Sequence, residues 1–232
     1  MSEPTNTVRL PEGCRVPGQV VERLVGVLGP GRGVVVLPTD SVYGIGALAV
    51  TGNPGHGRVF AIKGRDRSQT LPLLVAEPED LEVYGAGIPG WASRAARALW
   101  PGALTFVVRA SEGLPDEYKA ADGTVALRVP DAPIVRSVIE RAGAPLAMTS
   151  ANTHGAPSPA SFDELEEVIA GRADLVVDGG ACPVGTASTI VDATGAEPRI
   201  LREGSVTLDD VLVAGGLRPA AREAGAFGPS NQ

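Results

Sequence analysis

The stretch GVVVLPTDSVYG, residues 33–44, indicates both a fold class and a candidate site. Its first five residues are a short β-branched apolar run between turn residues, which predicts a buried strand. A polar loop with Thr39, Asp40 and Ser41 follows that strand directly. Taken alone, the loop is better explained as a tight turn, because Asp and Ser side chains hydrogen-bond the nearby backbone.

Apolar periodicity and turn residues predict further elements on both sides of this strand. Helices are predicted at residues 20–28, 54–63, 91–100, 134–142, 161–169 and 208–213. Further strands are predicted at residues 71–76, 104–109, 125–129, 146–148, 175–177, 189–191 and 199–201. Asn53 and Pro54 suit the start of the second helix, and Ser161 with Glu164 suggests a capping box for the fifth. This mixture indicates an α/β protein with a twisted mixed sheet and flanking helices.

The predicted elements lie between residues 17 and 213, with no internal linker long enough to divide them. We therefore expect one domain over residues 17–213. Residues 1–16 are polar and irregular, which predicts a flexible N-terminal arm. Residues 214–232 are rich in Gly, Ala and Pro, which predicts a disordered tail.

Composition and charge exclude several classes of protein. Hydrophobic residues make up 44% of the chain and charged residues 20%, as in ordinary globular proteins. No run approaches the roughly 18 apolar residues of a membrane helix, and the first residues lack a secretory pattern. We therefore expect a cytoplasmic protein without a membrane partner. The net charge of −7 argues against a broad nucleic-acid-binding surface, although a local basic pocket stays possible.

The potential metal ligands are few. Cys14 and Cys182 are the only cysteines and have no CxxC spacing, so two free thiols are expected in place of a structural zinc site. His56 and His154 are the only histidines, which excludes a histidine-rich centre. The sequence therefore predicts no dedicated metal site.

Three more polar clusters follow predicted strands or a helix, where ligands usually bind in open α/β sheets. They are residues 63–67 (KGRDR), residues 149–152 (TSAN), and the strand-end arginines Arg128 and Arg202. Each has a structural explanation: KGR suits a helix C-terminus with a glycine cap, and the others suit a loop or solvated ends. The sequence contains no GxxxxGK[ST], and no GxGxxG follows a strand.

Six motifs together carry more information than any one of them. PTDSVYGIG (38–46), IKGR (62–65), ALRVPD (126–131), TSANTHG (149–155), ASTIVD (187–192) and ILREG (200–204) occur in that order. The series resembles that of the YrdC-like family, and the resemblance extends over residues 20–213. It is closest to the single-domain branch of the family.

The resemblance implies a concave α/β domain with a basic cavity, and a nucleotidyltransferase that condenses L-threonine, bicarbonate and ATP to L-threonylcarbamoyladenylate and pyrophosphate. That product would enter the threonylcarbamoyl modification of tRNA adenosine 37 through downstream transfer machinery, with weak or no direct tRNA binding by this chain. By similarity, L-threonine would contact Ser41, Arg128, Ser150 and Ser188. ATP would contact Arg65, Gln69, Thr124, Asn152, Ala160 and Arg202, and the catalytic cations would be Lys63 and Arg65.

These residue types suit that chemistry. The Arg128 guanidinium can bind a carboxylate through two hydrogen bonds, and serine hydroxyls suit an amine and a hydroxyl. Attack on the α-phosphorus builds negative charge, which Lys63, Arg65 and Arg202 could neutralise. Mg²⁺ is expected with the ATP, although no carboxylate cage is visible, and a turn explains Asp40 better than a metal does.

Three departures from the family's pattern leave alternatives open. Residues 66–72 (DRSQTLP) differ from the usual stretch after KGR, His154 stands where the family has Ser, and Ser41 stands where Thr is usual. A paralogue that forms carbamoyladenylate from carbamoyl phosphate is therefore one alternative. A non-enzymatic RNA-binding module is another, and the acidic charge disfavours it.

Overall fold

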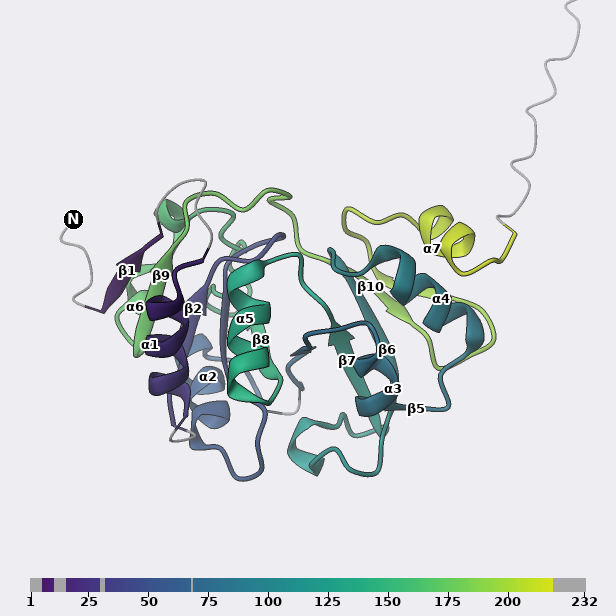
Figure 1. The fold of residues 1–232 in the computed structure, drawn as a ribbon, viewed down its shortest axis with the longest axis horizontal. Helices are drawn as coiled ribbons and strands as arrows, with labels where there is room; N and C mark the ends of the chain where they lie inside the picture. The colour runs from purple at the N-terminus through teal and green to yellow at the C-terminus, as the bar shows by residue number, and fades with distance from the viewer. Residues whose placement is uncertain (1–5, 11–15, 30–31, 68, 219–232) are drawn as a thin grey trace, which may run out of the picture.

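The computed structural model describes residues 6–10, 16–29, 32–67 and 69–218 (Figure 1). The α-helices are α1 (Gly18–Leu28), α2 (Pro54–Lys63), α3 (Asp80–Tyr84), α4 (Gly90–Leu99), α5 (Pro133–Ala142), α6 (Glu167–Ala170) and α7 (Leu208–Ala214). The strands are β1 (Thr7–Arg9), β2 (Val35–Leu37), β3 (Gly44–Leu48), β4 (Leu73–Leu74), β5 (Gly85–Ala86), β6 (Leu104–Ala110), β7 (Thr124–Arg128), β8 (Leu146–Ser150), β9 (Leu175–Asp178), β10 (Thr189–Asp192) and β11 (Arg199–Arg202). Two short 3₁₀ turns cover Asp116–Tyr118 and Phe162–Glu164.

The strands form one mixed sheet, which confirms the predicted α/β class. Its order is β1-β9-β2-β3-β8-β4-β7-β6-β10-β11, with β5 paired to β6 outside this path. The sheet contains parallel pairs, such as β2 with β9 and β6 with β10, and antiparallel pairs, such as β3 with β8. Within the described residues, no helix is long and apolar enough to cross a bilayer.

Helices cover both faces of the sheet, because its strands send alternate side chains to opposite sides. On β2, Val35 and Leu37 belong to the core that packs under α1 and α5, whereas Val36 belongs to the larger core under α2, α4, α6 and α7. On β9, Val176 likewise faces the side opposite to its neighbours. These strands are apolar on both faces, so they appear in the sequence as continuous runs.

Helix α2 shows how local sequence sets an element's ends. The Asn53 side chain caps the helix by accepting a hydrogen bond from the Gly55 N–H at 2.7 Å, and Pro54 occupies the first turn. The helix ends at Lys63 because Gly64 adopts the left-handed conformation, with φ of 64°. The predictions for both ends of this helix are confirmed.

Strand β3 is absent from the sequence prediction, because Gly44 and Gly46 interrupt its apolar pattern. Both glycines allow β8 to approach closely. A Cβ atom at Gly44 would lie 2.5 Å from the Met148 sulfur, and one at Gly46 would lie 2.7 Å from the Ala147 carbonyl oxygen. The strand needs glycine at these two positions, although glycine has a low propensity for β structure.

Three further expectations require correction. Thr7–Arg9, expected in an irregular arm, forms β1 and pairs with β9. Residues 149–150 continue β8 and are not part of the loop that follows. The capping box at Ser161 does not form: that side chain bonds the Glu164 carboxylate at 3.3 Å, and the segment contains a 3₁₀ turn and the short α6. Most of the predicted tail, residues 219–232, lies outside the described residues.

Residues 179–188, which we call the crossing segment, connect two strands that lie far apart in the sheet. Strand β9 is second in the strand order and β10 is ninth, and the chain between them passes over the top of the molecule in Figure 1. The Tyr43 hydroxyl holds the start of the segment by donating to the Gly180 carbonyl at 2.9 Å and accepting from the Gly179 N–H at 3.0 Å. The segment therefore stays close to the polar loop after β2.

Candidate functional site

A small pocket of about 100 Å³ lies where the loop after β2 and several strands meet. Ligand pockets for drug-sized molecules are several times larger, so this one suits a small polar molecule or one end of a larger one. Its polar walls come from the loop after β2, the ends of β7, β8 and β11, and the residues around the start of β10. The lining residues are Thr39, Ser41, Val42, Tyr43, Gly44, Pro72, Leu74, Thr105, Arg128, Met148, Thr149, Ser150, Ala187, Ser188, Ile190 and Arg202.

Thr39 shapes the loop after β2. Its hydroxyl donates to the Val42 carbonyl at 2.7 Å and accepts from the N–H groups of Ser41 and Val42 at 3.1 and 3.2 Å. These bonds close the turn and aim Ser41 into the pocket. The sequence predicted that Asp40 would have the turn role, and this is wrong: Thr39 makes the turn bonds and the Asp40 side chain is directed to an arginine.

Arg128 is a buried cation at the end of β7. Its guanidinium donates to the Gly102 carbonyl at 2.9 Å, to the Ser41 hydroxyl at 2.8 Å and to the Asp40 carboxylate at 2.5 Å. The side chains of Arg128 and Asp40 are 7% and 6% exposed. Burial lowers the pKa of Arg128, and the neighbouring Asp40 opposes that shift. The pocket thus has a fixed guanidinium in its wall.

Ser188 and Arg202 form a second polar group in the pocket wall. The Arg202 guanidinium donates to the Ser188 carbonyl at 2.7 and 3.1 Å and to the Ser188 hydroxyl at 3.2 Å. That hydroxyl also shares a hydrogen bond of 2.8 Å with the Thr105 hydroxyl. Burial, and then the charge of Arg128, lower the pKa of Arg202. The two arginines are therefore close enough to act on one anionic ligand.

Lys63 lies at the end of α2 with only 2% of its surface exposed, and it does not line the pocket. Its ammonium donates to the carbonyls of Ser150 and Asn152, the latter at 2.7 Å, and weakly to the Asn152 side-chain oxygen at 3.4 Å. Burial lowers the pKa of Lys63 to about 8, the Arg65 charge adds to this, and Glu166 opposes it. Lys63 thus anchors the backbone that presents Ser150.

Arg65 lies two residues beyond Lys63, just after the Gly64 cap and beside the pocket. It donates to the hydroxyl of Thr149, a pocket residue, and to the Thr70 carbonyl, both at 3.3 Å. Among the described residues its buried Nε–H has no hydrogen-bond partner. Burial lowers the pKa of Arg65. Each terminal nitrogen of Arg65 carries a second N–H, so the half-buried guanidinium can still donate to an acceptor beside Thr149.

The remaining predicted site residues lie away from the pocket. Gln69 is exposed on the segment after α2. Asn152 uses its amide to donate to the Thr153 and Ala156 carbonyls at 2.8 and 2.7 Å. The Ala160 N–H donates to the Glu164 carboxylate, at 2.8 Å.

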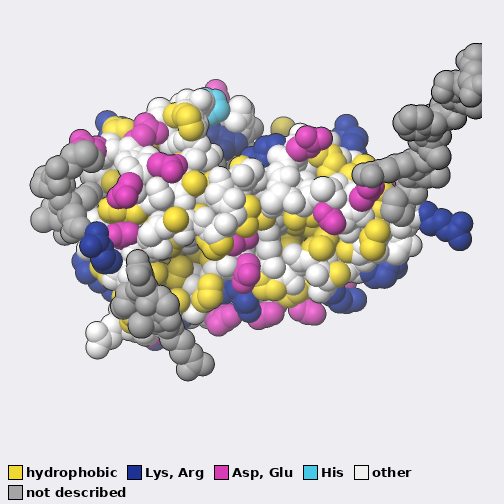
Figure 2. Space-filling view, turned by 90° about the horizontal axis from the view of Figure 1, so that it is seen from above, with side chains coloured by type: hydrophobic (Ala, Val, Ile, Leu, Met, Phe, Trp, Pro, Cys, Tyr) yellow, Lys and Arg dark blue, Asp and Glu magenta, His cyan; other side chains and the backbone are white. Residues whose placement is uncertain are grey.

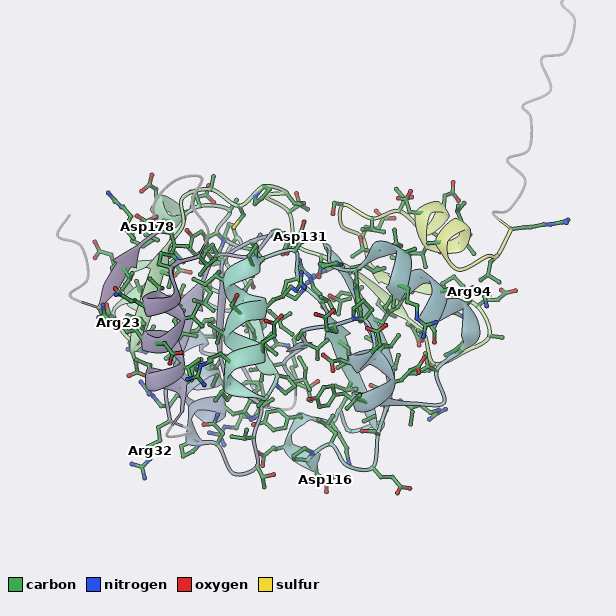
Figure 3. The ribbon with its side chains drawn as sticks, in the orientation of Figure 1. Arg23, Arg32, Arg94, Asp116, Asp131 and Asp178 are labelled. Atoms are coloured by element: carbon green, nitrogen blue, oxygen red, sulfur yellow. The ribbon has the colours of Figure 1, made fainter. Side chains whose placement is uncertain are left out.

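Thr124 is at the start of β7, four residues or about 13 Å along the strand from Arg128. Its hydroxyl donates to Asp122 at 2.7 Å. Figure 3 shows the two ends of this region: Asp131, shortly after β7, lies at the upper edge with Asp178, whereas Asp116, shortly before β7, lies at the lower edge. Thr124 is therefore at the opposite end of β7 from Arg128 and does not line the pocket.

Sequence reasoning missed several pocket residues. Thr105 lies within the strand LTFVVR, where a threonine between apolar residues was the available signal, and the structure buries it. The apolar walls contributed by Leu74, Met148 and Ile190 gave no signal, because in the sequence they resemble any core residue.

The possible metal ligands are dispersed. The residues that the structure describes contain no group of three or more His, Cys, Asp or Glu side chains that could hold an ion. Cys182 is buried with a free thiol, and burial raises its pKa to about 11. Cys14 lies outside the described residues.

Comparisons with known proteins show the family to which the chain is similar. The model of the Sua5/YciO/YrdC family, described as telomere recombination, matches residues 31–204. The threonylcarbamoyl-AMP synthase of Pyrococcus abyssi is 38% identical over 178 residues, covering 77% of this chain and 52% of that protein. A putative threonylcarbamoyl-AMP synthase of Mycobacterium tuberculosis is 34% identical over 210 residues, covering 90% and 96%. The chain thus spans about half the length of the first relative and nearly all of the second.

A solved structure of a relative has a similar fold. The crystal structure of P. abyssi Sua5 complexed with L-threonine aligns with a TM-score of 0.81 at 35% identity. The alignment covers 90% of this chain and 59% of that one.

Proposed function

The chain belongs to the Sua5/YciO/YrdC family, and we propose that it is a nucleotidyltransferase that makes L-threonylcarbamoyladenylate. The threonine amine and bicarbonate give a carbamate with loss of water. The carbamate oxygen then attacks the α-phosphorus of ATP and releases pyrophosphate. The observation that carries the proposal is the convergence of Ser41, Arg128, Ser150 and Ser188, distant in sequence, on one small pocket.

L-threonine is proposed to occupy this pocket. The Arg128 guanidinium has five N–H donors and spends three on the protein, which leaves two for a carboxylate. The hydroxyls of Ser41, Ser150 and Ser188 can accept from the amine or bond the substrate hydroxyl. Apolar neighbours such as Met148 and Ile190 offer a surface for the methyl group.

The phosphates are proposed to lie beside Arg65 and Arg202. The bond from Arg65 to Thr149, a pocket residue, supports this, as does the position of Arg202 in the pocket wall. Both cations would stabilise the charge that develops during attack, and Mg²⁺ would enter with the triphosphate, bound by phosphate oxygens. Lys63 would act indirectly, since its donors are spent on the loop at 150–152. For Gln69, Thr124, Asn152 and Ala160, a contact with ATP rests on the motif resemblance alone.

The test is substrate dependence of pyrophosphate release. Purified protein with ATP and Mg²⁺ should release pyrophosphate only when L-threonine and bicarbonate are both present. Lys63→Ala and Arg65→Ala should reduce the rate, whereas the matched changes Lys119→Ala and Arg97→Ala, at residues that do not line the pocket, should not. Release that needs neither threonine nor bicarbonate would contradict the proposal.

The carbamoyladenylate alternative predicts turnover with carbamoyl phosphate in place of threonine and bicarbonate. Of the three departures from the family's pattern, Ser41 lines the pocket, and the stretch 66–72 reaches it only through Pro72. His154 and Asp66 are exposed, and the backbone N–H of His154 bonds the Lys63 carbonyl. Ser41 keeps the hydroxyl that the family's usual threonine supplies at this position. The departure at residue 41 therefore preserves the contact proposed for the substrate L-threonine.

The RNA-binding alternative predicts salt-sensitive tRNA binding without nucleotide turnover. Acidic and basic side chains are interspersed on the face seen in Figure 2, where they do not form one continuous basic surface. This arrangement supports weak or no direct tRNA binding. We propose that the product passes, in the cytoplasm, to separate machinery that modifies adenosine 37 of tRNA.

A further inference from the structure

Asp40 is a buried carboxylate to which the motif resemblance gives no ligand. It is 5% exposed and lies in the loop after β2, where Thr39 already supplies the bonds that close the turn. Its carboxylate accepts from Arg128 at 2.5 Å. Arg128 and Ser41 line the pocket, whereas Asp40 does not appear among the described residues in its walls. The Asp40 carboxylate therefore acts on the pocket through its bond to Arg128.

The guanidinium of Arg128 is held at three points. Its Nε–H bonds the Gly102 carbonyl, and its two terminal nitrogens bond Ser41 and Asp40 respectively. Because a guanidinium is planar and rigid, three bonds to fixed partners determine both its position and the tilt of its plane. The two remaining N–H bonds then have fixed directions. Of the three partners, Asp40 is the only carboxylate.

The backbone of Asp40 joins a third element to this arrangement. Its carbonyl accepts from the Val184 N–H at 2.9 Å, in the crossing segment that leads to Ser188. One residue thus connects the loop after β2, the end of β7 and the crossing segment. These three elements supply Ser41, Arg128 and Ser188 to the pocket.

We propose that Asp40 is a positioning residue, which acts as a hydrogen-bond acceptor that holds the Arg128 guanidinium in the orientation needed for the substrate carboxylate. This inference rests on the proposed function for the identity of that substrate. The role depends on the place of the acceptor atom more than on its charge, since a negative charge beside Arg128 competes with an anionic ligand.

Two substitutions at Asp40 distinguish the position of its acceptor atom from its negative charge. Asp40→Asn keeps an oxygen acceptor at the same reach and removes the charge, whereas Asp40→Glu keeps the charge and moves the acceptor by one methylene. Glu22→Gln is the matched control, because it alters an exposed pair with Arg141 on α1 and α5. Each variant is measured by circular dichroism, by calorimetric titration with L-threonine, and by pyrophosphate release with threonine and ATP varied in turn.

We expect Asp40→Glu to raise the KM and Kd for L-threonine about 10–100-fold, because misplacement of a positioned group by about 1 Å has effects of that size. Its KM for ATP should stay within about twofold, and Asp40→Asn should bind L-threonine within about threefold of wild type, since a neutral acceptor still holds the donor. If Asp40→Glu does not fold, Asp40→Ala takes its place with the same expectation.

The inference is overturned if Asp40→Asn binds threonine as poorly as Asp40→Glu, if both bind like wild type, or if affinity for ATP falls as much as affinity for threonine. A wild-type protein that neither binds L-threonine nor releases pyrophosphate would contradict the proposed function itself. A wild-type protein that binds threonine while the variants match it would contradict only the role of Asp40.

Discussion

Lys63 and Arg128 are both buried cations beside the same pocket, and the protein holds them in opposite ways. Arg128 is paired with the Asp40 carboxylate and lines the pocket. Lys63 is bonded only to neutral oxygens of residues 150 and 152 and lies behind the pocket wall. The first cation is neutralised by a partner and is available to a ligand, whereas the second is spent on the protein's own backbone.

The difference has an electrostatic consequence. A carboxylate neighbour favours the charged form of a cation and opposes the cost of burial, whereas carbonyl oxygens offset that cost only in part. Burial lowers the pKa of Lys63 to about 8, within the range of ordinary buffers. Arginine remains protonated in such buffers. The two regions therefore respond differently to mutation and to pH, and three predictions follow from that contrast.

The largest effect is expected from Arg128→Met. It leaves the Asp40 carboxylate buried without its cation, and removing one partner of a buried pair typically costs about 3–5 kcal/mol. Urea unfolding should show that loss, and pyrophosphate release should fall to background. The double variant Arg128→Met with Asp40→Leu should recover much of the stability but none of the activity. If the double variant is no more stable than the single one, the pair is not the source of the cost.

A smaller effect is expected from pH at Lys63. Between pH 8 and the ordinary lysine pKa of 10.5, the folded state has lost a proton that the unfolded state still holds. The unfolded state binds more protons there, so stability rises with pH, by up to about 1.4 kcal/mol per pH unit. We expect wild type to gain about 1–2 kcal/mol over Lys63→Met between pH 8 and 9.5.

Urea unfolding of both proteins across that range measures the difference. The stability of Lys63→Met is subtracted from that of wild type because the raised pKa values of Cys182 and Tyr43 make stability fall with pH at high pH. Lys119→Met, which removes the other lysine, should show no such difference. A difference between wild type and Lys63→Met that is flat with pH would mean that Lys63 keeps an ordinary pKa.

The smallest effect is expected from Thr39→Val, which keeps the shape of the side chain and removes its hydroxyl. The turn loses bonds to Ser41 and Val42, and a typical net loss is about 1 kcal/mol. Because Ser41 then moves relative to Arg128, the KM for threonine should rise while that for ATP does not. Thermal unfolding and steady-state kinetics measure the two effects, and an unchanged KM would show that the turn does not set the place of Ser41.

Local signals in the sequence determined more of the fold than of the site. Helix α2 was predictable at both ends, because Asn53 and Gly64 act within one turn of the chain. Strand β3 was not, because Gly44 and Gly46 are needed for the approach of β8, about 100 residues later in the sequence.

Five residues that the motifs predicted for the site line one pocket in the structure: Ser41, Arg128, Ser150, Ser188 and Arg202. What their neighbours do could not be derived from the motifs. The partnership of Asp40 with Arg128 and that of Lys63 with residues 150 and 152 join positions more than 80 residues apart. Such pairings depend on the register of the sheet, and no local pattern specifies it.

The crossing segment limits the molecule's geometry in a further way. Seven steps separate β9 from β10 in the order β9-β2-β3-β8-β4-β7-β6-β10, or about 34 Å at about 4.8 Å per strand. The eleven residue steps from Asp178 to Thr189 can cover at most about 36–40 Å. Most surface loops tolerate changes of length cheaply. This one bridges two distant strands, so its length sets an upper limit on the separation that the two halves of the sheet can reach.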